Sequence, residues 1–222
     1  MSYYMLRMDT PISNPHPWAT VGMGKGGDYN WFDRTAAIGH GWGRNLPHWR
    51  QDGAIYFVTF RTADSIPAPV LAEWQRERAA WLAAHPEPHD DATTREFHRL
   101  FTERMHRFLD DGHGDCPFRS AELRQCVVEV LTHLDGATDG GYALDAFVIM
   151  PNHVHVLVAP RGEAQLSEIC KTWKSVAAHR VNKQIGRRGA LWQEESWDHI
   201  IRSADHLERY RRYIAENPKR LP

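Results

Sequence analysis

Two histidines one residue apart lie in one of the most apolar stretches of the chain, AFVIMPNHVHVLVAP at residues 146–160. Side chains at positions i and i+2 of a β-strand project to the same face of the sheet, so His153 and His155 would lie side by side. The valines between and after them would then project to the opposite, buried face. Two adjacent imidazoles can bind a divalent metal ion, although histidines also occupy half-buried positions where they bind nothing.

A metal site needs further ligands, and the sharpest candidate lies in the C-terminal sequence ERYRRYIAENPKR. Residues four apart share one face of a helix about a turn apart, which places Tyr213 beside Asn217. The amide oxygen of Asn217 would complete a site with the two histidines and leave positions for water or phosphate oxygens. Two imidazoles and a neutral amide, with no thiolate, suit Mg²⁺ or Mn²⁺. Zn²⁺ stays open as well, because imidazole binds it readily.

Two alternatives depend on neighbouring residues. Tyr210 lies three residues before Tyr213 on nearly the same helix face and is a rival nucleophile, although an aromatic residue at this spacing is more often a packing residue. No Asp or Glu lies beside His153 and His155 in the sequence. This disfavours a metal-dependent hydrolase in which a carboxylate acts as general base.

The histidine pair requires a hairpin that presents it. Pro151 cannot lie inside a central strand and Pro-Asn suits a tight turn, so we expect strands at residues 142–149 and 153–158. Aromatic and β-branched residues predict another strand at residues 54–60. Apolar residues at helical spacing predict helices at about residues 70–84, 93–109, 120–134, 166–186 and 204–216.

These elements indicate an α+β fold, in which helices pack on a small antiparallel sheet. The length of 222 residues fits one domain with appendages. Residues 1–43 are rich in Gly, Pro and Asn and show no periodicity, so we interpret them as a loosely structured N-terminal extension. Residues 44–222 would then form the domain that carries the chemistry.

The composition places the protein in a broad class. With 42% hydrophobic and 25% charged residues, it resembles a soluble globular protein that buries a core. The N-terminus lacks the apolar segment of a signal peptide, and no apolar run is long enough to span a membrane, so we expect a cytoplasmic protein with no membrane partner. Three cysteines without a CxxC pair exclude a disulfide framework and a cysteine-type zinc ribbon.

Charge is distributed unevenly, although the formal net charge is only −1. Residues 161–222 contain 13 Lys and Arg against 8 Asp and Glu, which leaves 14 against 20 for residues 1–160. Such a basic segment is either a polyanion-binding face or an ordinary solvated surface.

The sequence MPNHVHVLV resembles a motif of the IS200-like Y1 transposase superfamily, and in particular of the REP-associated tyrosine transposases. YFVTFRTADSIP upstream and LWQEESWDHIIRSADHLERYRRYIAENP downstream extend the resemblance over residues 44–222. His153 and His155 correspond to the HUH motif, a histidine pair that flanks a bulky apolar residue. Tyr213 lies at the position of the nucleophilic tyrosine, and Asn217 at that of the helix residue that completes the metal site.

The resemblance implies a ferredoxin-like sheet with the HUH motif on a central strand. It also implies a single-strand DNA endonuclease and strand transferase that uses a divalent metal, Mg²⁺ or Mn²⁺. The tyrosine of such an enzyme forms a 5′-phosphotyrosine with the DNA and frees a 3′-hydroxyl. The implied substrates are hairpin or palindromic elements. The chemistry fits Tyr213, because a free tyrosine has a pKa of about 10 and needs a metal or base to attack at neutral pH. The alternative is a catalytically idle regulator that binds DNA hairpins.

The implied partner is single-stranded or hairpin DNA, bound by a monomer or a homodimer that associates with the nucleoid when it holds DNA. Phosphate contacts supply most nonspecific affinity for DNA, so basic side chains in the C-terminal segment are candidates for this surface. The predicted DNA-binding residues are Lys171, Lys174, Arg187, Arg188, Arg211 and Arg212.

Overall fold

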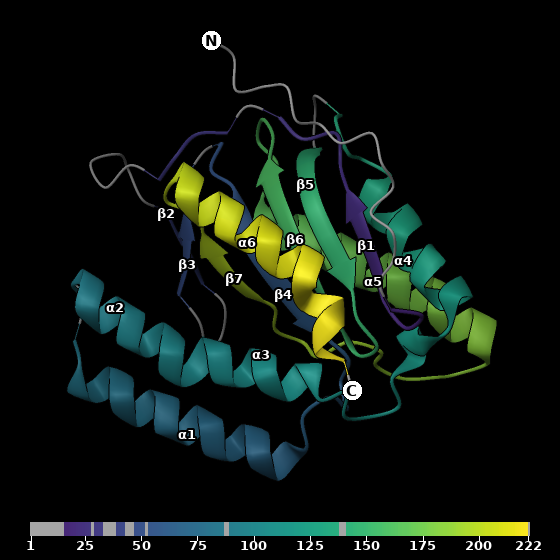
Figure 1. Cartoon of the computed structure of the whole chain (residues 1–222), viewed down its shortest axis with the longest axis horizontal. Coiled ribbons are helices and arrows are strands. Elements are labelled where there is room, and N and C mark those ends of the chain that lie inside the picture. The colour runs from purple at the N-terminus through teal and green to yellow at the C-terminus, as the bar shows by residue number, and fades with distance from the viewer. Residues whose placement is uncertain are drawn as a thin grey trace.

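The computed structural model describes residues 16–27, 29–32, 39–42, 47–51, 53–86, 89–137 and 141–221. Its central feature is a five-stranded antiparallel sheet in the order β1-β5-β6-β4-β7 (Figure 1). The strands are β1 (Thr20–Met23), β4 (Tyr56–Arg61), β5 (Tyr142–Ile149), β6 (His153–Pro160) and β7 (Trp197–Ile200). A separate antiparallel pair consists of β2 (Gly39–Trp42) and β3 (Pro47–Arg50).

Helices cover both faces and one end of this sheet (Figure 1). They are α1 (Ala68–Ala84), α2 (Asp91–Phe97), α3 (Glu103–Asp110), α4 (Ala121–Thr132), α5 (Leu166–Ile185) and α6 (Ala204–Glu216). Shorter turns are a π-helical turn (His98–Thr102) and two 3-10 turns (Pro117–Arg119 and Asn217–Arg220). None of the helices in the described residues is long and apolar enough to cross a membrane.

The α+β prediction is confirmed, and the connectivity defines it further. Without the edge strand β1 and the helices α1, α2 and α3 inserted after β4, the chain up to β7 runs β4, α4, β5, β6, α5, β7, and its four strands have the spatial order β5-β6-β4-β7. This is the split β-α-β-β-α-β arrangement of the ferredoxin-like fold. β6 is the middle strand of the five, so the histidine pair lies on a central strand, as predicted.

The predicted hairpin is confirmed, and its turn has the expected cause. β5 ends at Ile149, and β6 begins at His153 after Pro151 and Asn152. The backbone N–H of Met150 donates to the carbonyl oxygen of His153 at 2.8 Å and closes the turn. Because proline presets φ at the first corner of such a turn, the strand register follows from its position.

The two faces of the sheet pack against different helices. Val154, Val156 and Val158 lie in the core under α4 and α5, whereas Leu157 lies with Phe57 in the core under α6. Side chains on a strand alternate between faces, so the histidines share the α6 face. α6 crosses this face in Figure 1, while α4 and α5 lie behind the sheet.

The strand β1 is an element that the sequence did not predict. It pairs with β5 from Thr20, opposite Ile149, to Met23. A Cβ on Gly22 would lie 2.2 Å from the ring of Phe147, so this approach requires glycine. Residues 1–15, 28, 33–38 and 43 of the predicted extension lie outside the described residues, and the boundary at residue 43 stays a prediction.

The predicted helix at residues 93–109 is interrupted by the π-helical turn between α2 and α3. A π-turn accommodates one extra residue per turn, which rotates the residues after it around the helix axis. Asp110 follows the predicted helix in the sequence, but it is the last residue of α3 and it is buried.

A buried carboxylate attaches α6 to the sheet. Asp145 lies where the register between β5 and β6 shifts, and it is 3% exposed. Its carboxylate accepts hydrogen bonds from Arg211 Nε at 2.8 Å, from a second Arg211 nitrogen, and from the Tyr29 hydroxyl at 2.8 Å. This fixes the rotation and height of α6 over β5.

Replacing Asp145 with Asn should lower the free energy of unfolding by about 2 kcal/mol, because hydrogen bonds to charged groups contribute about 1.5–3 kcal/mol. The matched control is Glu208→Gln, which removes the exposed carboxylate partner of the same arginine and should cost less than about 1 kcal/mol. Urea denaturation of both variants measures the difference. Equal losses would show that Asp145 does not anchor α6.

Candidate active site

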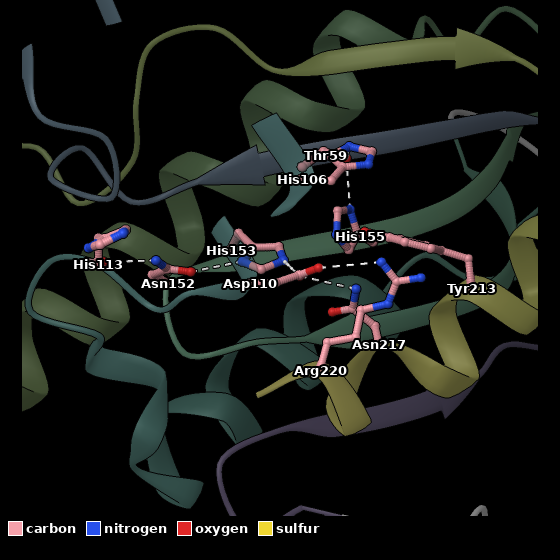
Figure 2. A network of polar contacts seen from close by, with 10 residues as sticks. All are labelled: Thr59, His106, Asp110, His113, Asn152, His153, His155, Tyr213, Asn217 and Arg220. Atoms are coloured by element: carbon pink, nitrogen blue, oxygen red, sulfur yellow. Dashed lines mark hydrogen bonds and ion pairs between the residues drawn. The ribbon is translucent and has the colours of Figure 1, made fainter. Parts of the chain in front are cut away.

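Side chains from three parts of the fold converge under the C-terminal end of α6 (Figure 2). β6 supplies His153 and His155, α3 supplies Asp110, and α6 with the turn after it supplies Tyr213 and Asn217. The histidines and Asn217 are fully buried, and Asp110 is 5% exposed. The structure therefore brings together the four residues that were named from the sequence, and it adds the aspartate.

Hydrogen bonds fix the tautomer of His153. Its Nδ1 lies 2.8 Å from Asn152 Oδ1, and Asn152 Nδ2 donates to the backbone carbonyl of His113 at 2.8 Å. This second bond orients the amide, so Nδ1 of His153 must carry the hydrogen and Nε2 must present a lone pair. Burial lowers the pKa of His153 to about 3, which keeps the ring neutral.

His155 is held in the same way by the neighbouring strand. Its Nδ1 lies 2.7 Å from the hydroxyl of Thr59, the residue opposite it on β4. Its Nε2 lies 3.3 Å from the Tyr213 hydroxyl, within hydrogen-bond distance. Burial is the main cause that lowers the pKa of His155 well below its ordinary value, and the interaction with His153 lowers it further. Both imidazoles are therefore neutral, and their ring centroids are 4.7 Å apart.

Three buried polar atoms of this cluster have no hydrogen-bond partner among the described residues: His153 Nε2, Asp110 Oδ2 and Asn217 Oδ1, although Asp110 Oδ2 lies 3.7 Å from Arg220 NH1 in an ion pair. Asp110 Oδ1 accepts from Asn217 Nδ2 at 3.3 Å and lies 3.7 Å from His153 Nε2. Since His153 is neutral, this last approach sets a lone pair against a carboxylate rather than forming an ion pair. Unpaired buried atoms are costly, and a cation among them would remove that cost.

The residues fit a divalent metal ion. One ligand atom each from Asp110, His153 and His155 all lie within 4.8 Å of one another. Two imidazole nitrogens and a carboxylate oxygen are ligands that Mn²⁺ and Zn²⁺ accept, with Mg²⁺ favouring the oxygens. Asn217 presents its free amide oxygen to the same cluster, and its predicted role as a direct ligand stays a prediction.

The expectation that no carboxylate accompanies the histidine pair is wrong. Asp110 is 43 residues before His153 in the chain and reaches it only because α3 ends beneath α6. One signal was available, since His106 and Asp110 are four apart and both are buried. Burial raises the pKa of Asp110 to about 6, so the carboxylate needs a cation to stay charged at low pH.

Tyr213 lies at the edge of the cluster and Tyr210 does not. Burial, followed by the charge of Asp110, raises the pKa of Tyr213 above its ordinary value, so its hydroxyl is protonated at neutral pH. Tyr210 packs on Phe57 and His199, with ring centroids 4.3 and 4.7 Å away. The geometry thus favours Tyr213 as the reacting hydroxyl.

Residues 121–217 match the family model described as Transposase IS200 like. This segment is thus similar to an IS200-like transposase domain. It contains the histidine pair, Tyr213 and Asn217, and it ends at Asn217 itself, whereas Asp110 and Thr59 lie before it. The predicted resemblance to this superfamily is confirmed.

Two solved structures are more distantly similar to this chain. One is described as the REP-associated tyrosine transposase bound to a REP hairpin, with 17% identity and a TM-score of 0.40 over 78% of this chain and 73% of that chain. The other is a candidate transposase from Deinococcus radiodurans R1, with 16% identity and a TM-score of 0.32 over 82% and 98% of the two chains. No curated protein matches the sequence.

Two of the six predicted DNA-binding cations, Arg211 and Lys174, are partly buried against internal partners. Arg211 is bound to Asp145 and Glu208. Lys174 is half-buried and donates to the backbone carbonyl of Glu194, and burial lowers its pKa. Both side chains stabilise the fold around the site, which leaves less of their charge for a ligand.

The other four cations do not form one surface. Lys171 and Arg188 lie on or just after α5, and both are exposed. Arg187 follows α5 and pairs with Asp115 at 3.4 Å. Arg212 is exposed on α6, which covers the opposite face of the sheet (Figure 1). The C-terminal basic excess is thus divided between the two faces.

Mn²⁺ should raise the melting temperature of the wild-type protein, because an ion that binds only the folded state adds about 2.7 kcal/mol at 100 times its Kd. The increase should be lost when His153 and His155 are both replaced with Ala. Each variant is compared with its own metal-free melting temperature, because these fully buried side chains also contribute to packing.

The control for this measurement is His113→Ala, which removes an exposed histidine ring whose backbone carbonyl alone contacts the site. It should keep the full increase. An equal increase in the double alanine variant would place the metal elsewhere.

Proposed function

We propose that this protein is a Y1 tyrosine transposase, a metal-dependent single-strand DNA endonuclease and strand transferase that acts on hairpin or palindromic elements, such as REP sequences. One observation carries the proposal: the Tyr213 hydroxyl lies 3.3 Å from His155 Nε2, at the edge of the His–His–Asp cluster. A nucleophile beside a candidate metal site, in a domain of a transposase family, supports transesterification of DNA.

The ligands of the proposed ion are His153, His155 and Asp110, with Asn217 completing the set. When bound, a divalent ion, Mg²⁺ or Mn²⁺, supplies a Lewis acid for the scissile phosphate. Asn152 holds the imidazole of His153 in the tautomer that presents Nε2, and Thr59 orients the ring of His155.

Tyr213 performs the covalent step. Its Oη attacks the phosphorus, the Oη–P bond forms as the phenolic proton passes to solvent, and the bond from phosphorus to the 3′-oxygen breaks as that oxygen takes up a proton from solvent. The products are a 5′-phosphotyrosine and a 3′-hydroxyl. Attack by a 3′-hydroxyl on the phosphotyrosine reverses the exchange, and no ATP is needed because one phosphodiester replaces another.

The raised pKa of Tyr213 makes this step depend on the cluster. A buried phenol with the carboxylate of Asp110 nearby does not ionise at neutral pH by itself. Positive charge brought among His153, His155 and Asp110 reverses that bias and favours the phenolate. Cleavage should therefore require both an ion and Tyr213.

Two other functions use the same residues. A regulator that only binds DNA hairpins would not need Tyr213 and the ligand cluster together, so their joint presence disfavours it. A phosphodiesterase is favoured by one observation, the position of Asp110 beside His153, where it could accept a proton from an attacking water. In that case Tyr213 would be dispensable.

Replacing Tyr213 with Phe should reduce cleavage of a single-stranded oligonucleotide by at least about 1,000-fold, because the nucleophile is lost while the ring stays. Tyr210→Phe is the matched control and should cleave at nearly the wild-type rate. Cleavage is followed with Mn²⁺ on a hairpin that has an unpaired flank. Wild-type cleavage by Tyr213→Phe would support the phosphodiesterase, and binding without cleavage by the wild type would support the regulator.

Binding should prefer a hairpin with an unpaired flank over a blunt duplex, and affinity should fall steeply with salt. Because Tyr213 lies on the α6 face, Arg212→Gln should lower the slope of log affinity against log salt by about 0.7–0.9, the value for one phosphate contact. Arg188→Gln, on the opposite face, should change the slope less. A salt titration by fluorescence anisotropy measures both, and equal affinity for duplex and hairpin would contradict the substrate class.

A further inference from the structure

Asp110 lies between two positions that a cation can occupy. One side of its carboxylate faces His153 Nε2 and Asn217 Nδ2, at 3.7 and 3.3 Å from Oδ1. On the other side, Oδ2 lies 3.7 Å from Arg220 NH1 (Figure 2). Both His153 and Asn217 are neutral. Within the described part of the chain, the guanidinium of Arg220 is thus the positive group that faces this carboxylate.

Arg220 also covers the proposed nucleophile. It is the last residue of the turn Asn217–Arg220, and its guanidinium carbon lies 4.9 Å from the centroid of the Tyr213 ring. The side chain is 47% exposed, so it can leave this position without unfolding the chain. A mobile cation next to Tyr213 is well placed to contact a phosphate that approaches the tyrosine.

A divalent ion in the cluster would change the balance of charge around Asp110. Without it, the buried carboxylate depends on Arg220 for compensation. With it, the ion neutralises the carboxylate from the histidine side and repels the guanidinium. The two cations therefore compete for one carboxylate.

We propose that Asp110 exchanges Arg220 for the divalent ion, and that the released Arg220 binds the phosphate of the DNA at Tyr213. The proposal rests on the proposed function, because it uses the same metal site. It assigns Arg220 two positions, one as the counter-ion of the metal-free protein and one as a phosphate contact. Metal binding and DNA binding then strengthen each other, since linkage between two sites is reciprocal.

Titration calorimetry with Mn²⁺ alone tests the competition. Arg220→Gln should tighten Mn²⁺ binding by about 3- to 10-fold, the effect of one unit charge a few ångströms away in a partly solvated site. Lys219→Gln is the matched control, because it removes the same charge from the same turn. The Lys219 side chain pairs with Glu216 rather than with Asp110. It should change the affinity by less than about 2-fold.

Asp110→Asn distinguishes exchange of the two cations at Asp110 from simple repulsion between Arg220 and the ion. It should weaken Mn²⁺ binding by about 10- to 100-fold. In the Asp110→Asn background, Arg220→Gln should have a smaller effect than in the wild type, because the shared carboxylate is gone. Equal effects in both backgrounds, or an effect no larger than that of Lys219→Gln, would overturn the proposal.

DNA binding tests the second position. In Tyr213→Phe, which does not cleave, Mn²⁺ should increase the affinity for a single-stranded oligonucleotide. Arg220→Gln in this background should reduce the increase by at least about 3-fold, whereas Lys219→Gln should retain it. An unchanged increase with Arg220→Gln would contradict a phosphate contact by this residue.

The outcomes distinguish this inference from the proposed function. If His153→Ala with His155→Ala binds Mn²⁺ as the wild type does, the metal site itself is wrong and both proposals fail. If the histidines are required but Arg220→Gln behaves as Lys219→Gln does, only the exchange fails. If Asp110→Asn does not fold, the difference in Mn²⁺ affinity between Arg220→Gln and Lys219→Gln still tests the exchange.

Discussion

The burial of two neutral histidines in the middle strand is the constraint on which the site depends. A fully buried imidazole cannot easily carry a charge, so His153 and His155 stay neutral. Asn152 and Thr59 each bind one Nδ1, and the Nε2 atoms face the cluster that also contains Asp110. A core strand that presents two lone pairs to a buried carboxylate is electrostatically incomplete, and a cation completes it.

One face of the sheet forms an apolar core, and the other face carries the candidate site. The face under α4 and α5 is apolar, while the face under α6 carries the histidines. Tyr213 and Asn217 reach this second face because α6 packs on it through Leu207 and Ile214 and is attached to β5 by the Asp145–Arg211 contact. The arginine that looked like a DNA contact in the sequence thus acts on the site by positioning the helix.

The features that could be predicted from the sequence are those that depend on residues close together in the chain. Pro151 set the hairpin, alternation set the face of the histidines, and helical spacing set α6 from residue 204 to residue 216. It did not predict β1, because Gly22 has no side chain to give a pattern, nor Asp110, which tertiary packing alone brings to His153. Charge counts also could not show that basic residues of α5 and α6 lie on opposite faces. Contacts between distant segments therefore account for what was missed.

The most direct measurement is the polarity and position of the covalent bond to DNA. A hairpin oligonucleotide with an unpaired flank, labelled at its 5′ or its 3′ end, is incubated with the protein and Mn²⁺, and the products are denatured and digested with trypsin. Trypsin cuts after Arg211 and Arg212, so Tyr210 and Tyr213 fall on different peptides. The account predicts that the 3′ label stays on the Tyr213 peptide, while the 5′-labelled fragment is released with a free 3′-hydroxyl. A 5′ label on protein, a label on the Tyr210 peptide, or cleavage without an adduct would contradict it.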